Sequence, residues 1–199
     1  MANWCNLHLS VIGRKEDLVP FRRAAGRLKG RIDTSKSSVF LPEMEYGESR
    51  DLEADGVTPF KRRFARGEYL FQGRGDDHGE HFEGISRQYP ALSFVLAFGD
   101  PNGDAHGSYL LLNGKRRTWA VSARLHRQLM MNYYRRWKLL DSRGHVDYDA
   151  EDSDWAEWDA MFEMLEIAEK RWDAVVLRWL RERHPSRGRT TRVRTKVKA

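Results

Sequence analysis

The sequence predicts an α+β fold in which a β-sheet domain comes first and helices follow it. In the N-terminal half, apolar and polar residues alternate with a period of two, most clearly from residue 4 to 13. That period is typical of a strand with one buried face. After Ala123 the apolar spacing changes to the three-to-four period of a helix. The last fifteen residues carry many cations and cannot bury a core.

Composition supports one folded unit with a cationic end. The chain has 199 residues, of which 40% are hydrophobic and 12% aromatic, so a real core can form. A lone cysteine cannot form an internal disulfide, and no segment approaches the roughly 18 continuous apolar residues of a membrane span. With no secretory signal visible, we expect a cytoplasmic location. The net charge of +6 equals the charge of six tail cations, which are Arg187, Arg189, Arg192, Arg194, Lys196 and Lys198.

The first predicted strand explains the single cysteine. One face of the strand carries Cys5, Leu7, Leu9 and Val11, and the other carries Asn6, His8 and Ser10. Because Cys5 lies on the apolar face, we interpret it as a small buried hydrophobe rather than a nucleophile or metal ligand. His8 points to the opposite face, so it cannot serve Cys5 as a base.

The next elements follow from spacing and from chain breakers. A helix is expected within residues 15 to 29, where Pro20 is tolerated in a first turn and Gly30 ends it. A short strand is expected at 37–42, followed by a long surface loop at 43–58.

The rest of the sheet domain completes a recognisable order. We expect a strand at 68–74, a helix at 79–88 and a central strand at 91–100. A hairpin at 108–123 reverses at Asn113-Gly114, which suits a two-residue turn. The order β-α-β-β-α-β with an extra hairpin is the split βαβ arrangement of ferredoxin-like folds.

Two helices are predicted after the sheet domain. The first has basic residues opposite its apolar face: Arg124, Arg127, Arg135 and Lys138. The second, at 155–183, has an apolar stripe that only Glu169 interrupts, formed by Trp155, Trp158, Phe162, Leu165, Trp172, Val176 and Trp179. We expect an antiparallel hairpin against the sheet, or a dimer seam. The predicted organisation is therefore a ferredoxin-like domain at 1–123, a helical extension at 124–184 and a flexible basic tail at 185–199.

The start of the chain resembles a known signature. It is similar to the N-terminus of the YubB-type ferredoxin-like domain proteins in Asn3, Trp4, Cys5, Leu9, Val11 and Gly13. Further matches are Tyr89-Pro90, Leu92, Phe94 and Gly107, so the resemblance covers about residues 1 to 120. The chain departs from the family at Leu7 and at the segment GRGDDHGEH. The resemblance implies a bacterial, plasmid or phage protein without an established activity, and it carries over no catalytic residue.

The densest group of possible metal ligands is DDHGEH, at residues 76 to 81. Imidazole and carboxylate bind divalent ions, which makes Asp76, His78, Glu80 and His81 a candidate metal site. We favour the simpler interpretation, in which these acids stabilise the free amides at the start of a helix.

The basic tail is the best functional lead. Its cations suit sequence-independent contacts with nucleic-acid phosphates, although a merely solubilising terminus is also possible. The arginine and lysine stripe at 124–138 extends that surface. We therefore expect a non-enzymatic binding or adaptor protein that needs no cofactor and whose partner is nucleic acid or another protein. The alternatives are a metal-dependent hydrolase using residues 76 to 81, and an oligomer assembled through Trp155, Trp158, Phe162, Trp172 and Trp179.

Overall fold

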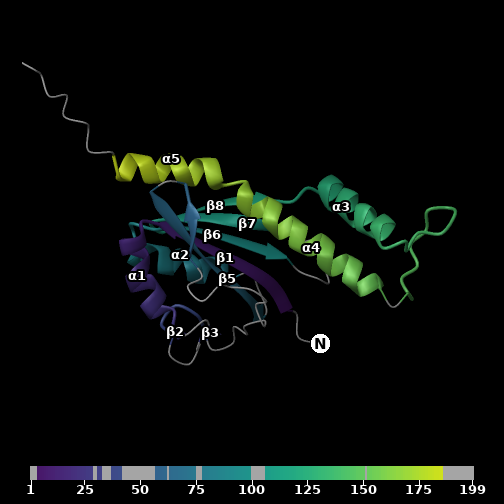
Figure 1. Cartoon of the computed structure of the whole chain (residues 1–199), viewed down its shortest axis with the longest axis horizontal. Coiled ribbons are helices and arrows are strands. Elements are labelled where there is room, and N and C mark those ends of the chain that lie inside the picture. The colour runs from purple at the N-terminus through teal and green to yellow at the C-terminus, as the bar shows by residue number, and fades with distance from the viewer. Residues whose placement is uncertain are drawn as a thin grey trace, which may run out of the picture.

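The computed structural model describes residues 4–28, 31–32, 37–41, 57–61, 63–74, 78–99, 106–150 and 152–185. Within these ranges the chain forms a six-stranded antiparallel sheet in the order β4-β5-β1-β6-β7-β8 (Figure 1). A separate pair, β2 (Arg27–Leu28) and β3 (Arg31–Ile32), lies outside it. The strands of the large sheet are β4 (Val57–Phe60), β5 (Phe64–Arg74), β1 (Trp4–Gly13), β6 (Ser93–Gly99), β7 (His106–Leu112) and β8 (Lys115–Ala120).

Helices α1 (Lys15–Ala24) and α2 (Gly79–Gln88) cover one face of this sheet. The alternating apolar residues of β1 point into this layer and pack with Phe21 of α1 and Phe82 of α2. Cys5 belongs to the same cluster, and its thiol lies 3.6 Å from the carbonyl oxygen of Gly99. The prediction of a buried, structural cysteine is confirmed.

The opposite face is covered as well, by α4 (Ser153–Lys170) and α5 (Asp173–Arg183) (Figure 1). Val176 and Leu180 of α5 pack on Ile12 and Val95, while Leu165 of α4 packs with Ala97 of β6. The expectation that β1 has only one buried face is therefore wrong. Its polar side is covered because the C-terminal helices return across the sheet.

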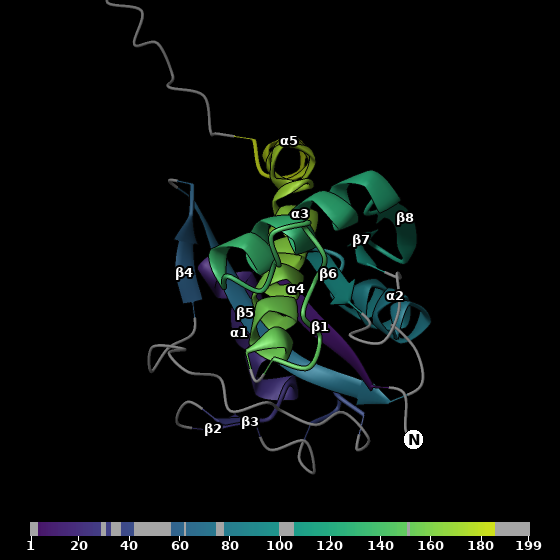
Figure 2. The same ribbon diagram turned by 90° about the vertical axis from the view of Figure 1, so that its right-hand side faces the viewer.

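Helix α3 (Ala123–Arg136) forms a helical hairpin with α4 (Figure 2). Hydrogen bonds join this part of the chain to α4: the Tyr134 hydroxyl donates to Glu157 over 2.9 Å, and the indole of Trp137, just after α3, donates to Asp159 over 3.2 Å. Of the two predicted arrangements, a hairpin against the sheet is the one observed. None of the helices in the described part of the chain combines the length and apolar character that a bilayer crossing requires.

Several predicted elements differ from the structure. The helix expected within residues 15 to 29 spans only Lys15–Ala24, with Pro20 in its interior rather than its first turn, because the chain turns at Gly26 (φ +73°) into β2 before it reaches Gly30. The single helix expected at 155–183 is interrupted at Arg171 and Trp172, where the Trp172 indole donates a 2.8 Å hydrogen bond to Ser108 of β7. Residues 37–41 form a bend instead of a strand, because the Ser37 hydroxyl accepts from the amides of Val39 and Phe40. The strand expected at 68–74 begins earlier, at Phe64. Its first residues pair with β4, which starts at Val57 within the segment expected to be a surface loop.

Candidate functional site

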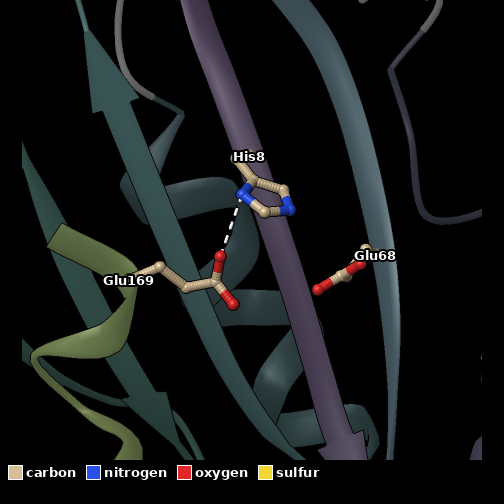
Figure 3. A group of neighbouring side chains, drawn as sticks. All are labelled: His8, Glu68 and Glu169. Atoms are coloured by element: carbon tan, nitrogen blue, oxygen red, sulfur yellow. Dashed lines mark ion pairs between the residues drawn. The ribbon is translucent and has the colours of Figure 1, made fainter. Parts of the chain in front are cut away.

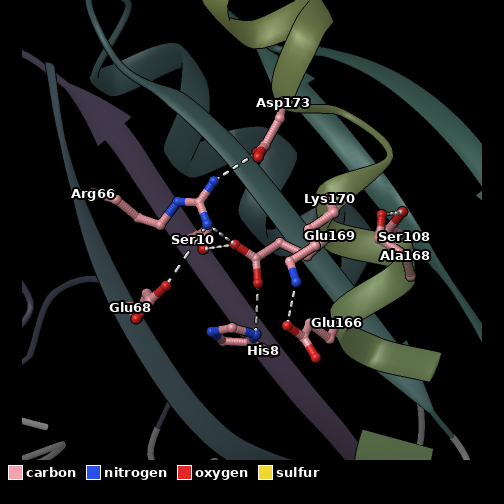
Figure 4. A network of polar contacts seen from close by, with 10 residues as sticks. All are labelled: His8, Ser10, Arg66, Glu68, Ser108, Glu166, Ala168, Glu169, Lys170 and Asp173. Carbon is pink, nitrogen blue, oxygen red and sulfur yellow. Dashed lines mark hydrogen bonds and ion pairs between the residues drawn. The ribbon is translucent and has the colours of Figure 1, made fainter. Parts of the chain in front are cut away.

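A polar network lies between β1 and the junction of α4 with α5 (Figures 3 and 4). Its centre is Glu169, which is 4% exposed and reaches down from the last turn of α4. Oxygen Oε1 accepts from the Ser10 hydroxyl at 2.6 Å and from Arg66 Nη1 at 2.8 Å. Oxygen Oε2 lies 3.0 Å from His8 Nδ1. Three donors from two strands therefore converge on one helical carboxylate.

Strand register brings these donors together. Ser10 is paired with Glu68, and Ile12 is paired with Arg66. Paired residues of antiparallel strands point to the same face, so the polar side of β1 and the side chains of Arg66 and Glu68 share the α4 side of the sheet. Figure 4 shows His8, Ser10, Arg66 and Glu68 gathered beside Glu169 at the end of α4.

Arg66 links the network to α5 and to the sheet edge. Its Nη2 donates to Asp173 Oδ1 at 2.6 Å, at the first residue of α5. Its Nη1 also lies 3.8 Å from Glu68, and the guanidinium sits 4.8 Å from the centre of the Phe60 ring. One arginine thus contacts acids from the sheet and from both covering helices.

The network keeps Glu169 ionised. Burial by itself raises the pKa of this carboxyl, but the hydrogen bond and charge of His8, the charge of Arg66 and the Ser10 hydroxyl outweigh it. Together they lower the pKa of Glu169 to about 2. At neutral pH the site therefore holds a buried carboxylate contacted by His8, Ser10 and Arg66.

Sequence reasoning did not identify this site. Glu169 appeared only as an interruption of an apolar stripe, and His8 and Ser10 only as the outer face of a strand. Two features of the sequence together could have indicated it. Glu169 is an acid within the apolar stripe of a helix, and His8 and Ser10 form a polar strand face; buried polar groups of both kinds need partners.

A second candidate surface lies on α3. A shallow groove of about 420 Å³ runs along its outer side and is lined by Ala123, Arg124, Arg127, Gln128, Met131, Asn132 and Arg135. The helix contains no Asp or Glu, and its N-cap Ser122 accepts a hydrogen bond from the Leu125 amide. Three arginines of the predicted stripe are thus exposed along one groove. Lys138, exposed just after the helix end with φ at +59°, is not among the lining residues.

The described members of the 76–81 group point in different directions. His81 Nε2 lies 2.6 Å from the Val39 carbonyl oxygen, and Glu80 is exposed. His78 is buried at the start of α2, where its ring packs closely over Gly73. Asp76 lies outside the described residues. The proposed metal site there stays a prediction.

The aromatic residues considered for oligomerisation divide into two sets. Trp155 and Phe162 on α4 are 62% and 49% exposed, and Trp158 is half-buried. Trp172 and Trp179 are partly buried in the cluster that joins α5 to the sheet. An interface through the first set stays a prediction, whereas the second set packs within the chain.

The described residues thus present two candidate sites: the network around Glu169 and the arginine groove of α3. The tail cations at 187–198 lie outside the described ranges. Comparisons of the chain with protein-family models, with curated proteins and with solved structures give no match. The functional argument rests on the two sites themselves.

Proposed function

We propose that this protein is a non-enzymatic binding or adaptor protein that contacts nucleic-acid phosphates through the arginine groove of α3, assisted by its basic tail. The observation that carries the proposal is the alignment of Arg124, Arg127 and Arg135 along one groove of a helix without acidic residues. A guanidinium presents several donors in a planar fork that matches phosphate oxygens. Nothing in the helix itself offsets this positive field.

The length of the groove suits a nucleic-acid strand. Arg124 and Arg135 are eleven positions apart on α3, which is roughly 16 Å along a helix axis. Phosphates of one strand advance by about 3.4 Å of duplex axis each, so several lie within that span. Gln128 and Asn132 line the same groove and supply neutral donors of the kind that contact phosphate and sugar.

The order of the strands and helices supports a nucleic-acid surface that lies away from the sheet. In the chain, β1, α1, β4, β5, α2 and β6 follow the β-α-β-β-α-β order, and their strands are adjacent in the order β4-β5-β1-β6. This supports a ferredoxin-like split βαβ with β7 and β8 as the extra hairpin. RNA-binding sheets of that kind stack bases on an open face. Here α4 and α5 occupy that face, so α3 is the better candidate surface.

The resemblance to YubB-type proteins adds a context for this proposal. Cys5, Leu9 and Val11 of the shared signature lie in the buried core of β1. They are therefore scaffold residues, and the binding surface on α3 lies beyond the part of the chain that resembles the family. We propose a bacterial or mobile-element origin from this resemblance alone, and the binding surface on α3 does not depend on it.

Replacing Arg124, Arg127 and Arg135 together by glutamine should weaken nucleic-acid binding about a hundred-fold at about 50 mM salt. The reason is the loss of three charge-assisted contacts. The slope of log affinity against log salt concentration should fall by about two to three, because each phosphate contact contributes about one. Fluorescence anisotropy with labelled single-stranded and duplex oligonucleotides measures both quantities.

The matched control removes three exposed arginines elsewhere, Arg171, Arg178 and Arg181. It changes the net charge equally and should leave most of the affinity in place. An equal loss in both triple variants would show that only net charge matters. A wild-type protein without measurable affinity at about 50 mM salt would overturn the proposal.

Removing residues 185–199 should abolish measurable affinity for DNA or RNA. Six cations leave with this segment, which is the whole excess charge of the chain. The same oligonucleotide titration tests it, with circular dichroism to establish that the shortened chain is folded. Unchanged affinity would mean that the tail serves only solubility.

A further inference from the structure

We propose that His8, Glu68 and Glu169 form a binding site for a divalent transition-metal ion, with Zn²⁺ as the representative ion. One donor atom from each residue lies within 4.8 Å of the donors of the other two. Figure 3 shows the three side chains directed toward a common space above β1. They come from β1, β5 and α4, three segments that are distant in sequence.

The distance between the two inner ligands fits a shared ion. His8 Nδ1 and Glu169 Oε2 are 3.0 Å apart. Two ligands bound to zinc at about 2.0 to 2.1 Å are separated by roughly 2.8 to 3.4 Å when the angle between them is about 90 to 110°. The Glu68 side chain is 28% exposed and its contact with Arg66 is long, at 3.8 Å, so its carboxylate can turn toward the ion at little cost.

The two oxygens of Glu169 have separate roles. Oε1 is held by Ser10 and Arg66, whereas Oε2 faces only His8 among the partners drawn in Figure 4. Metal-binding carboxylates and imidazoles are usually oriented by such outer hydrogen bonds. Arg66 therefore positions the ligand without occupying the oxygen that would bind the ion.

The charge of the site also favours a cation. The three carboxylates that contact Arg66, those of Glu68, Glu169 and Asp173, outnumber its single guanidinium group. The neighbouring Lys170 pairs with Glu166 on the helix surface. A divalent ion at His8, Glu68 and Glu169 would neutralise this excess.

The ligand set selects the class of metal. Imidazole with carboxylates suits zinc and related transition ions, whereas Mg²⁺ prefers oxygen ligands and retains its water. Three protein ligands leave a fourth position for water. The side chains of His8 and Glu68 are 16% and 28% exposed, so both ligands border solvent. A bound ion would fasten α4 to the sheet and stabilise the folded state by mass action.

Calorimetric titration of chelator-stripped, tag-free full-length protein with ZnCl₂ tests the proposal. We expect one ion per chain with a dissociation constant of roughly 10 µM or below. Thermal unfolding should shift upward with zinc and not with MgCl₂. Glu68→Gln, which alters the most exposed ligand, should weaken zinc binding at least about ten-fold. His8→Gln should have a similar effect.

Two control variants separate this site from other metal-binding groups. Glu166→Gln removes an exposed carboxylate from the same helix and should bind zinc like the wild type. The double variant His78→Gln/His81→Gln, at the other candidate group, should do so too. Circular dichroism establishes that each variant is folded. The proposal fails if the wild type shows no stoichiometric zinc, if Glu68→Gln binds zinc normally, or if the double variant alone loses binding.

Discussion

Replacing Glu169 by alanine is expected to lower the free energy of unfolding by about 3 to 5 kcal/mol. The carboxylate accepts from His8, Ser10 and Arg66 in a buried site. Without it, these donors stay covered by α4 and lose their common acceptor, which costs far more than the loss of an exposed ion pair. Urea denaturation at pH 7, followed by tryptophan fluorescence in the presence of a chelator, measures the change.

Glu166 provides the matched control for this substitution. It lies one turn earlier on α4, is exposed and pairs with Lys170. Glu166→Ala should change the free energy of unfolding by less than about 1 kcal/mol. A double-mutant cycle between Glu169 and Arg66 should give a coupling of about 1 to 3 kcal/mol. Equal effects of the two glutamate substitutions would contradict a central role for the buried network.

Acidification is expected to remove about 3 kcal/mol of stability through Glu169 alone. The pKa of this carboxyl falls from the ordinary 4.5 to about 2 in the folded protein. A lowered folded-state pKa contributes stability that is complete above pH 4.5 and is lost as the pH falls toward 2. The groups that contact Glu169 are His8 and Ser10 from β1 and Arg66 from β5, and Arg66 in turn contacts Glu68 of β5 and Asp173 of α5.

Comparison with Glu169→Gln isolates this contribution, because glutamine does not titrate. The difference in unfolding free energy between wild type and variant should be largest near pH 7. It should shrink steadily between pH 4.5 and 2, again in metal-free buffer. The difference in unfolding free energy between the wild type and Glu166→Gln should depend much less on pH. Parallel curves for wild type and Glu169→Gln would refute the assignment of a strongly lowered pKa.

Local sequence patterns determined most of the elements. Alternation defined β1 and placed Cys5 in the core, and Asn113-Gly114 located the β7–β8 turn. The arginine stripe of α3 was predicted because helical spacing puts residues three and four apart on one face. In each case the determining information lies within a few residues of the chain, where backbone preference and side-chain period act directly.

The tertiary structure alone decided which elements cover which face and which polar groups meet. Ser10 and Glu169 are 159 positions apart, and no local pattern specifies that one bonds the other. The break at Trp172 likewise depends on Ser108, a residue of a distant strand. Burial of the polar side of β1 required a carboxylate in the helix that covers it, because uncompensated donors in a dry interface are costly. The network around Glu169 therefore became visible only once α4 was placed on the sheet.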